Sequence, residues 1–142
     1  MKRAVLVMAW VLLACSGAST PTEPQPVASS ASAVTAGLWG GQHLSMNVAT
    51  SSASLEFDCA LGAISSAIPL DASGHFDVTG TYTQLHPGPV HEGEPANAQP
   101  ARYRGTVAGD SMTITITLTQ SGQDVGAYEL THGKSARLMR CL

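Results

Sequence analysis

Apolar and polar residues alternate one by one along several segments of this chain. The clearest segment is 111–119, where methionine, isoleucine and leucine alternate with serine and threonine. Side chains two residues apart lie on the same face of a strand, so this pattern predicts a half-buried β-strand with one hydroxyl-rich face. In 55–59 the same rule places Leu55, Phe57 and Cys59 on the inner face. Further segments with this alternation are 44–48, 76–82 and 103–107.

Short polar stretches that contain a glycine separate these segments and predict tight turns. The turn glycines are Gly74, Gly109, Gly122 and Gly133. About eight strands result, and no window of the domain shows helical periodicity over more than about two turns. We therefore predict an all-β fold, a small antiparallel up-and-down barrel of about eight strands, with a β-sandwich as the alternative. Sequential hairpins favour the barrel, because closure removes exposed strand edges.

Three further expectations concern this barrel. Gly80 and Gly105 take inward positions within strands, where a glycine allows sharp bending. Residues 136–142 form the last strand, although both of its faces carry apolar side chains. Large inward residues predict a mostly filled interior, and they are Phe57, Phe76, Tyr82, Tyr103, Ile114 and Ile116.

The N-terminus has the pattern of a bacterial lipoprotein signal. Lys2 and Arg3 precede an uncharged apolar run at 4–13, which is followed by Ala14 and Cys15. Ten helical residues span about 15 Å, half the thickness of a bilayer core, so the run is too short for a permanent span. The sequence predicts lipidation of Cys15 and anchoring by acyl chains. Because Ser16 is not the aspartate of an inner-membrane retention signal, we expect an outer-membrane or surface location.

Composition divides the chain into three parts. Residues 1–14 are the signal peptide, and 15–36 are the lipidated cysteine with a disordered Ser/Ala/Pro tether. Residues 37–142 are long enough for one domain. Without the signal, five basic and ten acidic residues remain, so no nucleic-acid partner is expected. Only 12% of the chain is charged, which is typical of a surface rich in threonine and serine.

Three cysteines are present, and lipidation of Cys15 leaves Cys59 and Cys141 in an oxidising compartment. We expect a disulfide between them, closing a loop of 82 residues. Neither cysteine has a CxxC-type neighbour, so the bond is expected to be structural.

The domain resembles a family of short uncharacterised bacterial lipoproteins and secreted proteins. The resemblance rests on LWGGQHL (38–44), LEFDCALGAI (55–64), GHFDVTGTYTQLHPGPV (74–90), ARYRGTVAGDSMTITITLT (101–119) and LTHGKSARLMRCL (130–142). It implies a single β-domain that contains both cysteines. It implies no activity and no functional residue.

Candidate chemistry is sparse. His86 and His91 are weak metal candidates in a long loop at 85–100, where their spacing imposes no shared face, and no cofactor is expected. Glu56 and Asp58 are expected to be solvated acids on an outer strand face. No serine lies in a G-x-S-x-G elbow, so no enzyme is predicted. The possible partner contacts are Trp39, which otherwise plugs the barrel, and the loop residues His86, His91, Glu92 and Glu94.

Three functional hypotheses follow. The first is a non-catalytic, envelope-anchored lipoprotein that binds an unknown protein or small ligand through its loops. The second is an inhibitor of a secreted enzyme, because the strand cysteine joined to a C-terminal cysteine is similar in layout to the periplasmic C-type lysozyme inhibitors. Their Ser-Gly-x-x-Tyr inhibitory loop is absent. A small-ligand-binding barrel is an alternative beside the inhibitor, and the third hypothesis, an enzyme, has no motif behind it.

Overall fold

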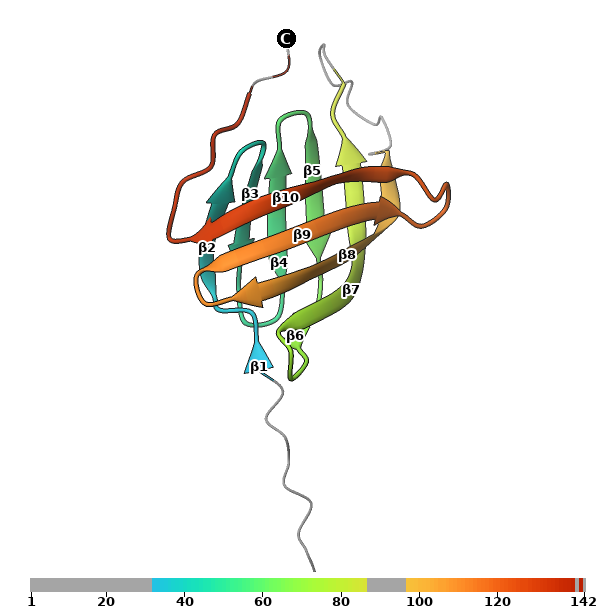
Figure 1. Ribbon diagram of the computed structural model, residues 1–142. Coiled ribbons are helices and arrows are strands. Elements are labelled where there is room, and N and C mark those ends of the chain that lie inside the picture. The colour runs from blue at the N-terminus through green and yellow to red at the C-terminus, as the bar shows by residue number, and fades with distance from the viewer. Residues whose placement is uncertain (1–31, 87–96, 140, 142) are drawn as a thin grey trace, which may run out of the picture.

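The computed structural model describes residues 32–86, 97–139 and 141, which form an all-β domain (Figure 1). Eight strands close into an antiparallel barrel in the order β10-β2-β3-β4-β5-β7-β8-β9. Each barrel strand pairs with the next one along the chain, and β10 pairs with β2 to close the barrel. The up-and-down barrel is confirmed, and the chain does not form a sandwich. The described residues contain no helix long and apolar enough to cross a membrane.

Strands on the two sides of the barrel cross at a steep angle, with β8–β10 in front of β2–β5 in Figure 1. The short strands β1 (Ser32–Ala33) and β6 (Pro69–Leu70) pair with each other at one end of the barrel. The barrel strands are β2 (Gly37–Gly41), β3 (Leu44–Val48), β4 (Ala53–Phe57), β5 (Ala60–Ile64), β7 (His75–Gln84), β8 (Ala98–Ala108), β9 (Ser111–Leu118) and β10 (Asp124–His132).

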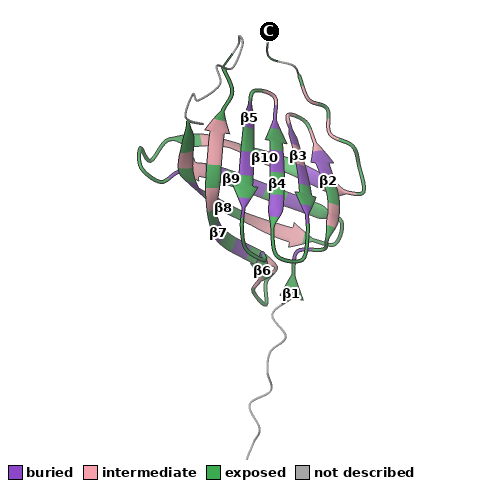
Figure 2. Ribbon diagram, turned by 180° about the vertical axis from the view of Figure 1, so that it is seen from behind, coloured by how far each residue is buried: buried purple, intermediate pink, exposed green. Residues whose placement is uncertain are grey.

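The predicted inner faces form the core. Along β3, β4 and β9 buried and exposed residues alternate, as the sequence pattern indicates, and Figure 2 shows the same alternation. Of the six large inward residues, five are buried and Tyr82 is half-buried. No polar or charged residue of the described part is buried. The largest fully buried side chains are Trp39, Tyr103, Leu44, Met46, Leu55, Ile64, Met112, Ile114, Ile116 and Leu130.

All four predicted turn glycines adopt a left-handed backbone. Their φ angles are 80° at Gly74, 60° at Gly109, 70° at Gly122 and 73° at Gly133. Residues other than glycine rarely adopt this backbone conformation, because their Cβ atom crowds the backbone. These residues therefore end the strands where the sequence predicts.

The two inward glycines within strands have a packing role. A Cβ on Gly105 would lie 2.5 Å from Cζ of Phe76, its cross-strand partner. A Cβ on Gly80 would lie 2.9 Å from Cε2 of Tyr103. Both distances are shorter than any real van der Waals contact, so the rings occupy the space that a side chain would need.

The domain begins before the predicted boundary at Gly37. Val34 is 6% exposed, and its amide donates to the carbonyl of Ile68 at 3.0 Å. The tether prediction was therefore wrong for residues 32–36. An aliphatic side chain in a run of small residues gains free energy by covering the barrel end next to Ile68, which is 2% exposed.

Two strand predictions near the cysteines were also wrong. β4 ends at Phe57, and the chain turns at Asp58 and Cys59, so Cys59 is exposed and does not point inward. β10 is the last strand of the described residues, and the described part of the predicted strand 136–142, residues 136–139 and 141, belongs to no strand. The described part of this segment lies outside the barrel wall and pairs only through a parallel bridge between Gln42 and Arg137. For this reason its apolar residues do not alternate between an inner and an outer face.

Candidate binding site at one end of the barrel

Four segments that are far apart in sequence meet at the barrel end opposite to β1. They are the β2–β3 turn with His43, the β4–β5 turn with Asp58, the start of the β7–β8 connection, and the C-terminal tail after β10. The Leu85 amide donates to the carbonyl of Cys59 at 2.9 Å, and Cys59 is bonded to Cys141. We call this end of the barrel the mouth.

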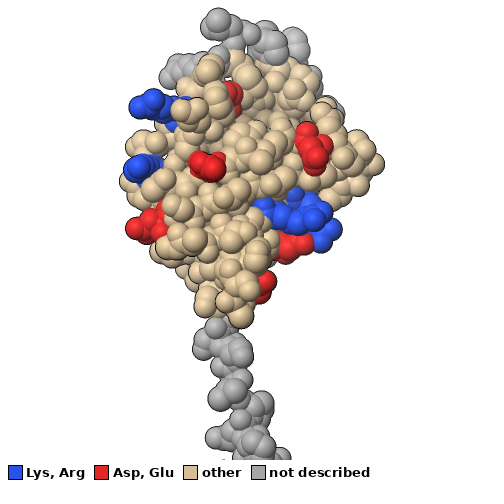
Figure 3. Space-filling view, viewed as in Figure 1, with Lys and Arg blue, Asp and Glu red and all other residues tan. Residues whose placement is uncertain are grey.

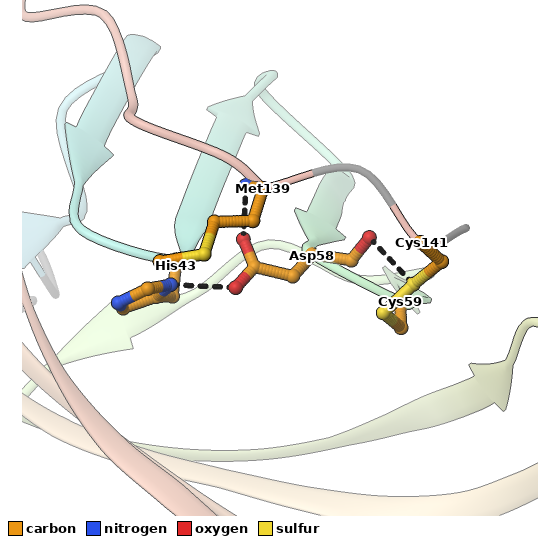
Figure 4. The surroundings of a disulfide bond; sticks show 5 residues. All are labelled: His43, Asp58, Cys59, Met139 and Cys141. Carbon is orange, nitrogen blue, oxygen red and sulfur yellow. Dashed lines mark hydrogen bonds and ion pairs between the residues drawn. A yellow bond between two sulfur atoms is a disulfide. The ribbon is translucent and has the colours of Figure 1, made fainter.

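Asp58 joins three of these segments (Figure 4). Its Oδ2 lies 2.5 Å from Nδ1 of His43, and its Oδ1 accepts a hydrogen bond of 2.7 Å from the Met139 amide. His43 adopts φ 67°, and it is the one described residue other than glycine with a positive φ. This conformation costs free energy and persists only where surrounding contacts hold it. The contact with Asp58 and the backbone bonds of the turn hold it here.

Electrostatics of the mouth follow from these contacts. The Met139 amide and the His43 ring stabilise the charged form of Asp58 and lower the pKa of its carboxyl. The side chains of His43 and Asp58 are 40% and 25% exposed, so this pair remains open to solvent. Asp58 therefore connects the β2–β3 turn to the tail, and it is not the solvated strand acid that the sequence predicts. Its companion Glu56 is exposed on β4, as expected.

The predicted disulfide between Cys59 and Cys141 is confirmed. The two Cα atoms are 5.5 Å apart, within the range that a disulfide allows. The bond connects the β4–β5 turn to the end of the tail, and Sγ of Cys141 lies 3.3 Å from the carbonyl oxygen of Asp58. The tail is thus bound to the mouth by both covalent and polar contacts.

Beneath these polar groups lies a cluster of three aromatic rings. The Phe57 ring packs edge-on against Tyr82 and Tyr128, with centroids 5.4 and 5.6 Å apart. Burial raises the pKa of both tyrosine hydroxyls, and the negative charge of Asp58 raises that of Tyr128 further. Both tyrosines are half-buried. Neither hydroxyl forms a hydrogen bond with a residue that the structure describes.

Trp39 does not expose a ring for a partner. Its side chain is 0% exposed, its Nε1 donates to the carbonyl of Thr35 at 2.9 Å, and its ring packs against His132. The interpretation of Trp39 as a contact residue was therefore wrong, because the core and the returning N-terminal segment enclose it. A Cβ on the following residue, Gly40, would lie 2.6 Å from the Ala136 amide nitrogen, so this glycine lets the tail pack on β2.

The loop candidates are only partly described. His86 is exposed and directly follows Leu85 at the mouth, while His91, Glu92 and Glu94 lie outside the described residues. β8 begins at Ala98, so the connection is shorter than the predicted 85–100. Within the described ranges, no three His, Cys, Asp or Glu side chains are grouped as metal ligands. The role of His86 as a contact stays a prediction.

Two grooves lie on the outer surface. One, of about 680 Å³, lies on the wall of β7–β9 beside β6 and is lined by residues that include Leu70, Asp77, Arg104 and Thr115. The other, of about 610 Å³, lies between β10, the β2–β3 turn and the tail. Sequence reasoning found neither groove, because each is formed by segments that meet only in the fold.

No family model, no curated protein and no solved structure matches this chain.

Proposed function

We propose that this protein is a non-catalytic, lipid-anchored envelope protein that presents its barrel mouth to a binding partner. The observation that carries the proposal is the position of the chain ends. β1, the first described element, lies at one end of the barrel, and Cys141, the last described residue, is bonded to Cys59 at the other end, in the mouth (Figure 1). A membrane anchor at Cys15 would therefore be attached to the end remote from the mouth.

The mouth has the properties of a binding platform. Its turns are fixed by the disulfide, by Asp58 and by backbone hydrogen bonds, so little ordering is needed when a partner binds. It offers a partly exposed imidazole on His43, two half-buried tyrosines and the exposed His86. Loops held by a rigid scaffold are where binding residues usually lie.

The interior supports a surface site over an internal one. Trp39, Tyr103, Ile114 and Ile116 are all 0% exposed and belong to the packed core of the barrel. A barrel of about eight strands has room for packed side chains or one small ligand. Because large side chains occupy this interior, the hypothesis of a small ligand inside the barrel loses its support.

Anchoring is tested by fatty-acid labelling in a bacterial host. Cells grown with an alkynyl fatty acid should label the wild-type protein, and Cys15→Ser should abolish both label and membrane retention. An unlabelled wild-type protein contradicts the anchor.

Display of the mouth is tested by photocrosslinking in the same cells. A photoreactive residue at position 86 should give one discrete crosslinked product. A matched probe at Ser73, which is exposed at the opposite end, should give none. The proposal fails if only position 73 forms a crosslink, or if neither position does.

A second candidate, inhibition of a secreted enzyme, is favoured by the bond between the β4–β5 turn and the C-terminal tail. The layout resembles that of periplasmic C-type lysozyme inhibitors in the link to a C-terminal cysteine, although Cys59 lies in the turn after β4 and not in a strand. The test is the lysis of a cell-wall suspension by a C-type lysozyme, with and without an equimolar amount of this protein. Unchanged lysis at a tenfold molar excess removes this candidate.

A further inference from the structure

The barrel is closed between β10 and β2 by a short pairing. β10 pairs with β9 from Asp124 to Thr131, whereas it pairs with β2 only from Leu130 to His132. The reason is that β2 ends at Gly41 and the chain turns at His43 into β3. On its other edge, β10 between Asp124 and Glu129 therefore has no strand partner among the described residues. We call this open edge the seam.

Backbone groups of β10 point into the seam. The carbonyl of Glu129 faces β2, because a Cβ on Gly41 would collide with that oxygen. In an antiparallel ladder, the N–H and C=O of one residue point to the same edge, and residues two apart share that edge. Ala127 is paired with Thr115 in regular register, so its N–H and C=O also face the seam. An unpaired edge of this kind is a template for an added strand.

A groove accompanies the open edge. It has a volume of about 610 Å³, within the range of ligand sites in proteins, and Ala127 and Glu129 line one wall. The tail forms the other wall with Lys134 and Arg137. Arg137 is fixed there, because its amide donates to Gly41 and its carbonyl accepts from His43, each at 2.9 Å.

Charge distinguishes this groove from the rest of the surface. Lys and Arg side chains gather at two opposite sides of the face in Figure 3, and most of that face is uncharged. Arg102 and Arg104 pair with Asp77. Lys134 and Arg137 are absent from every ion pair among the described residues. Glu129 is an acid on the opposite wall, so the two cations leave one net positive charge in the groove. Together with backbone donors of β10 that have no partner among the described residues, this charge suits a carboxylate.

We propose that the seam binds an extended peptide, which adds as a strand to the edge of β10 and places a carboxylate against Lys134 and Arg137. This inference rests on the proposed binding function and gives the chemistry of the partner. The backbone of the peptide bonds to Ala127 and supplies affinity, while the two cations supply selectivity for a chain end or an acidic side chain.

The test uses purified full-length protein in detergent and fluorescein-labelled heptapeptides of alternating threonine and valine. One peptide has a free C-terminal carboxylate, a second is a C-terminal amide with one internal aspartate, and a third is an amide without any acid. Fluorescence anisotropy should show at least tenfold tighter binding for one or both acidic peptides than for the neutral one. Equal binding of all three, or binding of none up to millimolar concentration, overturns the proposal.

Protein variants locate the site. Lys134→Gln combined with Arg137→Gln should lower the affinity of the acidic peptide at least tenfold, to the level of the neutral one. The matched control is Arg104→Gln on the wall of β8, which should leave the affinity unchanged. If Arg104→Gln weakens binding as much as the double variant, the charge effect is general and the site is not the seam.

Peptide variants test strand addition without any change to the protein. Methylation of alternate peptide nitrogens on one edge removes the N–H groups that would bond to β10. One of the two methylation patterns should abolish binding, and equal binding of both contradicts strand addition. The crosslinking at position 86 does not involve Lys134 or Arg137, so failure of this proposal can be told apart from failure of the mouth as a binding platform.

Discussion

Loss of the disulfide should destabilise the barrel by an amount that follows from its position. Cys59 and Cys141 are separated by 82 residues. The chain-entropy model assigns a crosslink of this span about 15 cal/mol/K, or about 4.5 kcal/mol at 25 °C. Such a figure is comparable to the whole net stability of a small domain, about 5–15 kcal/mol.

The expected mechanism is a gain of freedom in the unfolded chain. In the folded protein, the described part of the tail beyond Lys134 keeps three hydrogen bonds without the disulfide, two through Arg137 and one from Met139 to Asp58. We therefore expect Cys141→Ser to remain folded, with its free energy of unfolding lowered by about 3–5 kcal/mol. Because the tail is then held only by these bonds, hydrogen exchange at the Arg137 amide should accelerate more than exchange in β9.

The assay is guanidinium unfolding of residues 15–142, which lack Trp10, followed by fluorescence of Trp39, which is fully buried when folded. The disulfide-bonded reference and Cys141→Ser both carry Cys15→Ser, so that the thiol of Cys15 does not contribute. Met139→Ala is the matched control, because this tail side chain is 64% exposed and its loss should change stability by less than about 0.5 kcal/mol. A loss of less than about 1 kcal/mol in Cys141→Ser would refute the entropic argument.

Three further predictions test other parts of the structure. Tyr103→Phe removes the hydroxyl that donates to the Thr81 carbonyl at 2.6 Å, so urea unfolding should show a free energy of unfolding lowered by about 1 kcal/mol. Tyr82→Phe should lower it by less. An equal loss in both variants contradicts the role of this bond. The lowered pKa of Asp58 gives stability that is present above its unfolded pKa of 3.8 and is lost as pH falls through the folded pKa. Below pH 4, the free energy of unfolding should therefore fall more steeply with pH in the wild type than in Asp58→Asn. Identical pH profiles of the two proteins refute this prediction. Replacement of residues 86–97 by Gly-Asn should leave the thermal midpoint within a few degrees of the wild-type value, because Thr83 and Ala98 already pair where β7 and β8 meet the loop. An unfolded variant would show that the loop covers the barrel end.

Local pattern was sufficient for most of the barrel. The alternation in 111–119 gives β9 and its buried face, because a strand side chain faces the core or solvent according to its parity alone. The four turn glycines mark left-handed positions for an equally local reason. The disulfide followed by elimination, since two cysteines remained for one bond. The pattern gave a wrong prediction at Cys59, because β4 ends at Phe57 although the alternation in the sequence continues to Cys59.

The sequence by itself determined an all-β barrel of about eight strands, most of their inward faces and their turns, which depend on neighbours along the chain, and the cysteine pair, which followed by elimination. Only the tertiary structure decided that Trp39 is enclosed, that Asp58 holds His43 and Met139, and that β10 keeps an open edge beside Lys134 and Arg137. These features depend on contacts between residues up to 96 positions apart, such as His132 with Ala36. No local pattern encodes such contacts, because they arise from where the closing barrel brings the tail.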